Sequence, residues 1–237
     1  MAQYKNFDTY ISQDHHLNVK ESFKKISEIA SLNDKGNDTL QVLDVGCTTG
    51  ALIGYLKDCN PKWKYTGIDI SSKLLDVARE KMPDCKWVEG SGLDISSKFN
   101  KKFDLVVCFG VLGIFDEGDA IKLFDNLLKS VKPGGQIILF SQFNEMDVDT
   151  QINHRKYNKS GENYGWEKGW NNYFIKTVKG WLYGRVESVE FIDFDMPVDL
   201  EPQDDLVRSW TIEINNKRQL TNGLKLLIDL KFLKIQL

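Results

Sequence analysis

One turn of the chain combines residue types and spacing that suit the binding of a nucleoside. Residues 42–50 read VLDVGCTTG, an apolar run that ends in a turn containing Gly46 and Gly50. Glycine permits a tight turn and lets the backbone approach a ligand closely. Asp69 stands about twenty residues further on, at the end of a second apolar run, where a carboxylate can accept hydrogen bonds from both hydroxyls of a ribose. An Asp at a strand end is also a common turn former or helix cap, so the spacing alone leaves both roles open.

Other ligand-binding signatures are missing from the sequence. The turn lacks the third glycine of the dinucleotide fingerprint G-x-G-x-x-G, and no Gly-Lys-Ser/Thr follows it as in a P-loop. The four cysteines lie far apart, form no C-x-x-C pair and have no nearby histidine. Zinc needs clustered ligands and a disulfide scaffold needs denser cysteine, so we expect free thiols and no metal.

Strands and helices alternate around the turn, and this alternation predicts how its residues are positioned. Continuous apolar strands separated by helices indicate a parallel sheet covered on both faces. We therefore predict a doubly wound, mostly parallel α/β fold. The predicted strands are residues 40–45, 65–70, 86–88, 105–109 and 136–140, with a turn at 133–135. The predicted helices are residues 18–32, 51–56, 72–82 and 119–131.

The chain has no internal repeat, so we predict a single domain over residues 1–237. Its parts are a helical N-terminal segment (1–36), a core (37–141), an insert after the fifth strand (142–185) and a C-terminal part (186–237). The insert has no clean period and is rich in aromatic residues. The C-terminal part has strand-like runs at 186–194, 210–214 and 226–235, which we expect to close one side of the sheet. Its acidic stretch at 193–205 is predicted to be a solvated loop.

Five segments resemble, in order along the chain, motifs of the class I S-adenosylmethionine (SAM)-dependent methyltransferases. They are residues 44–50 (DVGCTTG), Asp69, residues 87–92 (WVEGSG), residues 103–112 (FDLVVCFGVL) and residues 127–139 (LLKSVKPGGQIIL). The resemblance covers about residues 40–141. It implies a Rossmann-like fold, SAM as the methyl donor and S-adenosylhomocysteine as the product. The cofactor-binding residues that it implies are Asp44, Gly46, Cys47, Thr48, Gly50, Asp69, Ile70, Gly90, Ser91, Gly92, Phe109 and Gly110.

Three positions depart from the pattern of the resembled family. Thr48 stands where the family often has glycine, so the turn is one Cβ bulkier, although the hydroxyl can still bind the amino-acid end of the cofactor. Ser91 stands where an Asp commonly accepts from the adenine amino group, and an uncharged acceptor there weakens the expected affinity. Residues 112–115 (LGIF) lack the family's frequent histidine, so we expect no base at that position.

Methyl transfer to an oxygen of high pKa needs a general base, whereas a phosphate-type oxygen is already anionic. His15 and His16 belong to the N-terminal segment, which in the resembled family often forms a lid over the cofactor. His154 belongs to the insert, and we take it as the candidate catalytic base, although a lone loop histidine is more often a surface residue. The weaker alternatives are Glu145, Asp147 and Tyr157.

The insert is the most individual part of the chain. Residues 151–181 contain seven aromatic side chains and six basic residues against two acidic ones. A basic, aromatic cover at the cofactor end of the sheet suits an anionic substrate. The candidate substrate-binding residues are Arg155, Lys156, Tyr157 and Trp166. The alternative is that the aromatic residues form a small core of their own and the lysines are simply solvated.

The composition of the chain limits the classes of partner that we expect it to bind. The net charge of −3 argues against a general nucleic-acid binder, and no apolar run approaches the roughly 20 residues of a membrane helix. The start of the chain lacks the apolar region of a secretory signal. We therefore expect a cytoplasmic protein that acts on a small molecule, without nucleic-acid or membrane partners. The oligomeric state is left open.

The leading hypothesis is an enzyme that transfers a methyl group from SAM to an oxygen of a small anionic acceptor. A weaker resemblance, centred on residues 218–224 (RQLTNGL), is to bacterial methyltransferases of capsule and surface-polysaccharide pathways. It implies capsule sugars and their O-methyl phosphoramidate groups as acceptors, and the basic insert suits phosphorylated or nucleotide-linked sugars. The alternatives are a methyltransferase that acts on a protein or another macromolecule, and a degenerate module that binds without catalysis.

Overall fold

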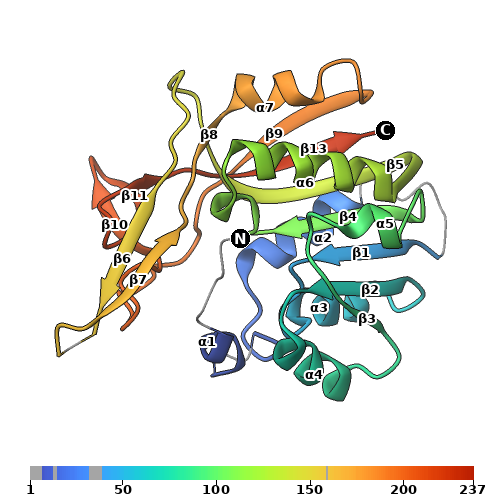
Figure 1. Cartoon of the computed structure of the whole chain (residues 1–237), viewed down its shortest axis with the longest axis horizontal. Helices are drawn as coiled ribbons and strands as arrows, with labels where there is room; N and C mark the ends of the chain where they lie inside the picture. Colours follow the sequence, from blue (N-terminus) through green and yellow to red (C-terminus); the bar gives the residue numbers. More distant parts are fainter. Residues whose placement is uncertain (1–6, 13–14, 32–38, 159) are drawn as a thin grey trace.

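Among the described residues of the computed structural model (7–12, 15–31, 39–158 and 160–237), eight strands form one sheet (Figure 1). In spatial order the strands are β3 (Lys86–Glu89), β2 (Lys64–Asp69), β1 (Gln41–Val45), β4 (Phe103–Phe109), β5 (Val131–Asn144), β13 (Leu230–Gln236) and β9 (Ser188–Phe194), with β8 (Tyr173–Phe174) paired to β5. Strands β1 to β5 are parallel, and β13 runs antiparallel to both β5 and β9.

Helices cover both faces of this sheet because successive residues of a strand point to opposite faces. Val106 of β4 packs in one apolar cluster with Phe124 and Leu182, whereas Val107 packs in a second cluster with Phe23. The helices of the first cluster are α5 (Ile95–Lys98), α6 (Glu117–Ser130) and α7 (Ile175–Leu182), and those of the second are α2 (Glu21–Ser31), α3 (Ala51–Cys59) and α4 (Ser72–Lys81). The predicted doubly wound α/β fold is confirmed.

The helix after β2 shows how local sequence sets its boundaries. The Ser71 hydroxyl oxygen accepts a hydrogen bond from the backbone N–H of Leu74 (3.3 Å) and so caps the first turn of α4. The helix ends at Lys81, shortly before Pro83, which cannot donate to the helix hydrogen-bond ladder. Both boundaries lie where the sequence predicts them.

The fifth strand is longer than predicted at both ends. β5 begins at Val131 rather than Gln136, because residues 132–135 bulge out between two positions that pair with β4. Gly134, with a φ of 74°, turns the chain inside this bulge. The predicted turn therefore lies within the strand. At its other end β5 continues to Asn144, past the predicted end of the core.

Only part of the C-terminal segment closes the sheet. β9 and β13 join it, as predicted, and the structure shows that their pairing is antiparallel. The run predicted at 210–214 forms β10 (Trp210–Ile214), but this strand pairs with β11 (Lys217–Thr221) and β12 (Leu227–Ile228) in a separate three-stranded sheet. The prediction for this run was wrong because a period of two indicates a strand without indicating its neighbour.

The insert folds into regular structure that its sequence does not reveal. β6 (Asn153–Tyr157) and β7 (Asn163–Lys168) form an antiparallel hairpin that extends to one side of the central sheet, at the left of Figure 1. Helix α7 then packs on the sheet through Val178 and Leu182. Short strands and a helix follow one another within this segment, so neither the strand period nor the helix period of apolar residues extends far enough to be recognised.

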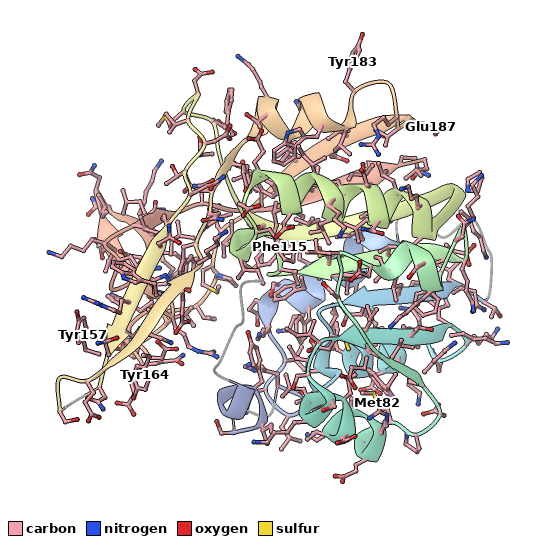
Figure 2. All side chains as sticks on the ribbon, in the orientation of Figure 1. Met82, Phe115, Tyr157, Tyr164, Tyr183 and Glu187 are labelled. Carbon is pink, nitrogen blue, oxygen red and sulfur yellow. The ribbon has the colours of Figure 1, made fainter. Side chains whose placement is uncertain are left out.

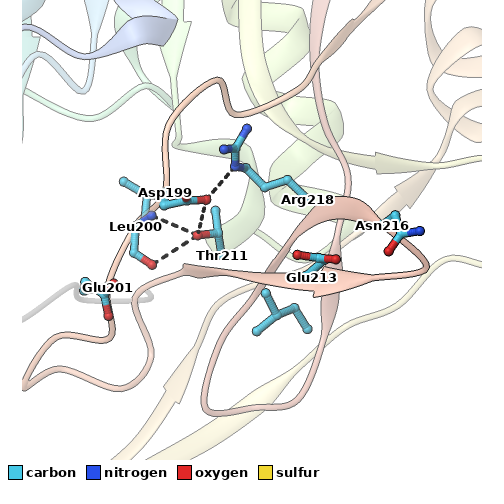
Figure 3. A pocket seen from close by; sticks show the side chains of 8 residues that line it. Asp199, Leu200, Glu201, Thr211, Glu213, Asn216 and Arg218 are labelled. Carbon is cyan, nitrogen blue, oxygen red and sulfur yellow. Dashed lines mark hydrogen bonds and ion pairs between the residues drawn. The ribbon is translucent and has the colours of Figure 1, made fainter.

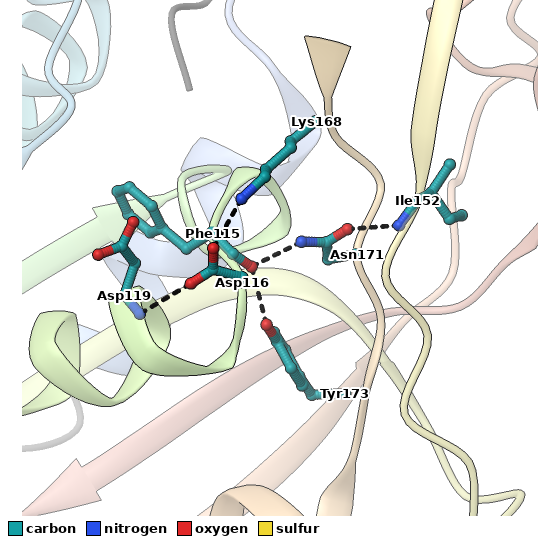
Figure 4. Close-up of polar contacts among 7 residues, drawn as sticks. All are labelled: Phe115, Asp116, Asp119, Ile152, Lys168, Asn171 and Tyr173. Atoms are coloured by element: carbon teal, nitrogen blue, oxygen red, sulfur yellow. Dashed lines mark hydrogen bonds and ion pairs between the residues drawn. The ribbon is translucent and has the colours of Figure 1, made fainter. Parts of the chain in front are cut away.

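Buried hydrogen bonds anchor the insert to the core (Figure 4). The side-chain amide of Asn171 and the hydroxyl of Tyr173 both donate to the carbonyl oxygen of Phe115, at 2.6 and 2.8 Å. The amide oxygen of Asn171 accepts from the backbone N–H of Ile152 at 2.8 Å. One buried side chain therefore joins the segment after the 3₁₀ helix η1 (Leu112–Ile114) to both ends of the β6–β7 hairpin.

Three further findings bear on the classes of protein considered above. No helix in the described part of the chain has the length and apolar content that a membrane span requires. Within the same residues, no group of three or more His, Cys, Asp or Glu side chains is arranged to hold a metal ion. The thiols of Cys47, Cys59, Cys85 and Cys108 are free.

We expect Asn171→Ala to lower the free energy of unfolding by about 1 to 3 kcal/mol, because it leaves the partly buried Ile152 N–H without its acceptor and takes one donor from Phe115. Urea denaturation of the full chain measures this change. Asn163→Ala is the matched control, since Asn163 is exposed and bonds only within its own turn, to Gly165. Equal stability of the two variants would contradict the anchoring role of Asn171.

Candidate active site

The turn after β1 needs glycine at two positions. Gly46 and Gly50 have φ angles of 76° and 78°. A Cβ on Gly46 would lie 2.5 Å from a methyl carbon of Val111, and one on Gly50 would lie 2.5 Å from the ring of Trp87. The backbone N–H of Gly46 donates to the carbonyl oxygen of Ile68 (2.8 Å), which ties the turn to the end of β2. The turn is therefore packed too tightly for a side chain at either position.

Asp69, at the end of β2, holds the same turn by its side chain. One carboxylate oxygen accepts from the backbone N–H of Thr48 (3.0 Å), and the other accepts from that of Ser71 (2.9 Å). Burial raises the pKa of Asp69, and these backbone N–H groups oppose the rise. Each carboxylate oxygen has more than one lone pair, so Asp69 retains the capacity to accept hydroxyl groups as well.

Thr48 has a left-handed backbone conformation, with a φ of 50°. This region favours glycine and strains a β-branched residue. The family's frequent glycine at this position therefore has a local cause. In this chain the hydrogen bond from the Thr48 N–H to Asp69 helps to hold the residue in that conformation.

Asp44 is the second buried carboxylate of the site. It is 2% exposed, and its Oδ1 has no hydrogen-bond partner within the described residues. Burial, and then the negative charge of Asp69, raises the pKa of Asp44 to about 7. A cationic ligand group brought to this carboxylate would supply both the missing hydrogen bond and a counter-charge. The site thus fits a positively charged ligand.

The topology brings the twelve predicted cofactor-binding residues together. Strands β3, β2, β1 and β4 are adjacent and parallel, and all twelve residues lie at or just beyond their carboxyl ends. Open α/β sheets bind their ligands at this edge. The residues are Asp44, Gly46, Cys47, Thr48 and Gly50 at β1, Asp69 and Ile70 at β2, Gly90, Ser91 and Gly92 at β3, and Phe109 and Gly110 at β4. The Ser91 hydroxyl oxygen also accepts from the N–H of Leu93 (3.1 Å) and so shapes its own turn.

A cavity of about 570 Å³ opens beside this edge, at the carboxyl ends of β4 and β5. The N-terminal segment, the β6–β7 hairpin and the loop before β10 complete its walls. Its volume suits a small molecule. The lining residues that matter below are Lys20, Phe109, Phe140, His154, Lys156, Val198, Arg208 and Leu230.

His154 lines this cavity and is 8% exposed. Its Nδ1 has no hydrogen-bond partner within the described residues. Burial lowers the pKa of His154 below its ordinary value, although Glu167, which faces it across the hairpin, acts in the opposite direction. The imidazole is therefore neutral near pH 7 and has a nitrogen that can accept a proton.

The structure divides the four predicted substrate-binding residues between two faces of the hairpin. Lys156 lines the cavity with His154. Arg155 lies on the outer face, with its guanidinium 5.1 Å from the ring centroid of Tyr157 and 5.0 Å from that of Trp166. Figure 2 shows Tyr157 at the outer edge of the molecule. The expectation that these four residues act on one ligand is corrected, because neighbouring residues of a strand point in opposite directions.

The stretch predicted as a solvated loop, residues 193–205, is mostly exposed and has no helix or strand after β9 ends at Phe194. It also contributes to the cavity wall through Met196, Val198 and Leu200. These apolar residues recur at every second position, which is the period of an extended segment with one covered face. That alternation is the signal that could have found them. The acidic composition of the segment concealed it.

The sequence prediction also missed two cationic residues of the cavity, Lys20 and Arg208. They come from opposite ends of the chain. Nothing in their local pattern marks either one, because each acquires its role only when the N-terminal segment and the loop before β10 meet at the carboxyl edge of the sheet.

A second hollow lies on the small three-stranded sheet (Figure 3). Its arginine, Arg218, is paired with Asp199 (2.7 Å), and the Thr211 hydroxyl bonds the same loop. These contacts hold the loop against β10 and β11. None of the predicted site residues lines this hollow, so we assign it a structural role.

Comparison with known proteins gives one family match and several relatives. The family described as "Methyltransferase domain" matches residues 43–137. A tRNA U34 carboxymethyltransferase of Nautilia profundicola is 30% identical over 64% of this chain and 47% of its own length. A malonyl-[acyl-carrier protein] O-methyltransferase of Acetivibrio thermocellus is 31% identical over 60% of this chain and 47% of its own length. The chain spans about half the length of these curated relatives.

Because one of these relatives is named for tRNA, the comparisons do not support the predicted exclusion of nucleic acid as a partner.

Solved structures share the fold over nearly the whole chain. A SAM-dependent methyltransferase from Clostridium acetobutylicum has a TM-score of 0.62 at 16% identity, over 98% of this chain and 99% of its own. The N-methyltransferase NodS from Bradyrhizobium japonicum, in complex with S-adenosyl-L-homocysteine, has a TM-score of 0.57 at 16% identity, over 98% and 97%. The solved structures therefore share the fold of this chain, and the methyltransferase-domain match covers residues 43–137 of it.

Proposed function

We propose that the protein binds SAM at the carboxyl ends of β1 to β4 and transfers its methyl group to an oxygen of a small anionic acceptor held in the adjacent cavity. The observation that carries the proposal is the buried pair Asp44 and Asp69, of which Asp44 has an unpartnered oxygen. When bound, SAM supplies an electrophilic methyl group on a positively charged sulfur, beside a cationic amino group. Both positive charges suit a site with two buried carboxylates.

The turn residues each have a distinct task in this proposal. Asp69 accepts from the ribose hydroxyls while its bonds to the Thr48 and Ser71 N–H groups keep the carboxylate fixed. Asp44 meets the cationic end of the cofactor. Gly46 and Gly50 keep the turn free of side chains, so the backbone lies close to the ligand.

The cavity supplies alignment and exclusion of water, which methyl transfer to an oxygen mainly requires. We propose that His154 takes a proton from an acceptor hydroxyl there, because it is buried, neutral near pH 7 and without a partner at Nδ1 among the described residues. His15 also lines the cavity. The alternative bases are less suited. Glu145 pairs with Lys231 (3.3 Å) and Asp147 with Lys176 (3.7 Å), and neither lines the cavity.

The acceptor class rests on charge together with the weaker resemblance noted in the sequence. We propose phosphorylated, phosphoramidate or nucleotide-linked sugars, as in surface-polysaccharide pathways, and S-adenosylhomocysteine formation is the readout for screening them. A tRNA acceptor is the second candidate. The exposed stack of Arg155 with Tyr157 and Trp166 favours it, since such faces stack on nucleic-acid bases. Product formation with tRNA but not with the sugars would make the small-molecule proposal wrong.

Asp69→Ala is expected to weaken SAM binding about tenfold to a hundredfold, because hydrogen bonds from the ribose to a charged acceptor are lost. Isothermal titration calorimetry on the full chain measures the Kd. Asp76→Ala is the control, since Asp76 is an exposed acid on α4 that pairs only with Arg79. Unchanged affinity in a folded Asp69→Ala protein would remove Asp69 from the site. Wild-type protein that does not bind SAM would favour the degenerate module.

The raised pKa of Asp44 predicts a pH dependence of both stability and binding. In the folded free chain Asp44 holds its proton up to about pH 7, whereas an unfolded chain releases it near pH 4. The contribution of Asp44 to the free energy of unfolding is therefore present below about pH 4 and is lost as the pH rises through about 7. A bound cation favours the ionised form. SAM affinity should therefore rise between pH 5.5 and 8, with proton release at the lower end. Asp44→Asn should abolish this release in calorimetry run in buffers of different ionisation enthalpy. Identical release in wild type and variant would contradict the assignment.

His154→Asn is expected to lower kcat about a hundredfold to ten-thousandfold with the acceptor that the screen identifies, while the Kd for SAM is unchanged. The wild-type rate should remain high to pH values below the ordinary pKa of histidine and then fall, because burial lowers the pKa of His154. This acid limb should disappear in the variant. An unchanged kcat would show that the methylated oxygen needs no base.

A further inference from the structure

The cavity contains a lysine whose charge no carboxylate of the described residues neutralises. Lys20 lines the cavity immediately before α2. Its ammonium lies over two aromatic rings, 5.5 Å from the centroid of Phe23 and 5.4 Å from that of Phe109. Within the part of the chain that the structure describes, no ion pair joins Lys20 to a carboxylate. Ring faces attract a cation more weakly than an anion does, so the ammonium is poised for an anionic partner.

A second cation shares this wall. Arg208, from the loop before β10, lines the same cavity and has its guanidinium 5.5 Å from the ring centroid of Tyr10. Burial, and then the positive charge of Arg208, lowers the pKa of Lys20 to about 8. Two cations that repel each other across a cavity wall cost free energy, and an anion bound between them offsets that cost.

Other charged residues of the cavity wall lie close to a residue of opposite charge or face a neighbour across the hairpin. Glu21 pairs with Lys24 (2.7 Å), and Asp205 lies 3.5 Å from Lys156. Lys168 pairs with Asp116 (2.7 Å), as Figure 4 shows, and Glu167 faces His154 across the hairpin. Lys20 and Arg208 are therefore two cations of the cavity wall that lie within electrostatic reach of each other.

We propose that Lys20 and Arg208 form an oxyanion subsite that takes a phosphomonoester group of the acceptor. A phosphomonoester carries close to two negative charges near neutral pH, which matches two cations, whereas a carboxylate or a phosphodiester carries one. Arg208 offers a planar fork of donors for two phosphoryl oxygens, and Lys20 offers a point charge for the third. The inference rests on the proposed function only in treating this cavity as the acceptor site.

The rest of the cavity indicates what the phosphoryl group is attached to. Phe140, Val198 and Leu230 line it with apolar surface, which suits the carbon face of a sugar or an aromatic ring. His154 also lines it and belongs to a different segment of the chain from both cations. The phosphoryl group thus serves as the anchor, and a separate hydroxyl of the same molecule is the one that meets the base.

Phenyl phosphate is the probe, because it joins an apolar ring to a phosphomonoester. Calorimetric titration into the full chain without SAM should give saturable binding, weakened about tenfold to a hundredfold in Lys20→Met and in Arg208→Met. Arg208→Lys, which keeps the charge but loses the fork, should fall between wild type and Arg208→Met. Lys24→Met is the matched control, since Lys24 lies in the first turn of α2, just after Lys20, and is exposed. It should bind as wild type does.

Three outcomes would overturn the subsite. One is wild-type protein that binds phenyl phosphate no better than benzyl alcohol. Another is a loss in Lys24→Met as large as that in Lys20→Met, which would indicate net charge alone. The third is equal affinity for the diester methyl phenyl phosphate, which would point instead to a phosphodiester such as a nucleic-acid backbone.

A SAM titration of the same proteins separates this inference from the proposed function. If Lys20→Met and Arg208→Met bind SAM as wild type does but lose phenyl phosphate, the subsite is supported independently of the cofactor. If wild-type protein binds phenyl phosphate through these residues but does not bind SAM, the proposed function fails and the subsite stands. If SAM binds and phenyl phosphate does not, the proposed function stands and the subsite fails.

Discussion

Two carboxylates buried close together are the constraint on which the rest of the site depends. The turn after β1 keeps its shape because Asp69 accepts the N–H of Thr48 while Gly46 and Gly50 leave no side chain in the way. Burial of negative charge is costly unless donors or cations meet it. Backbone N–H groups meet Asp69, but Asp44 retains an oxygen with no partner among the described residues. The folded chain thus contains a place for a cation that those residues do not themselves supply.

The parallel core could be predicted because its signals are local. Ser71 caps the helix that Pro83 follows, and the strands are continuous apolar runs whose burial on both faces leaves few alternatives. Gly46 and Gly50 predict a tight turn because they have no side chain, and the structure requires them at these positions for the same reason. Parallel strands connected by helices then bring the ends of β1 to β4 to one edge, so the positions of the turn residues follow from the fold.

The remainder of the site could not be predicted, because it depends on which segments meet. A basic, aromatic insert is visible in the sequence, but only the strand period of β6 separates Lys156, inside the cavity, from Arg155, outside it. A shift of one residue would exchange them. Lys20 and Arg208 are less predictable still, since they come from opposite ends of the chain and approach each other only across the finished sheet.

Under the proposed function, the arrangement of charge gives the donor and the acceptor different binding places. Carboxylates lie buried at β1 and β2, whereas cations line the cavity that begins at Phe109 on β4, so a positively charged donor and a negatively charged acceptor are each disfavoured in the other's site. The same asymmetry bears on turnover. In the proposed reaction, methyl transfer would remove the positive charge from the donor sulfur, whereas the product would keep its ammonium. Asp44 and Asp69 would then lose one of the two cationic groups that offset their charge, so the product would be held less tightly than the donor and its release would be favoured.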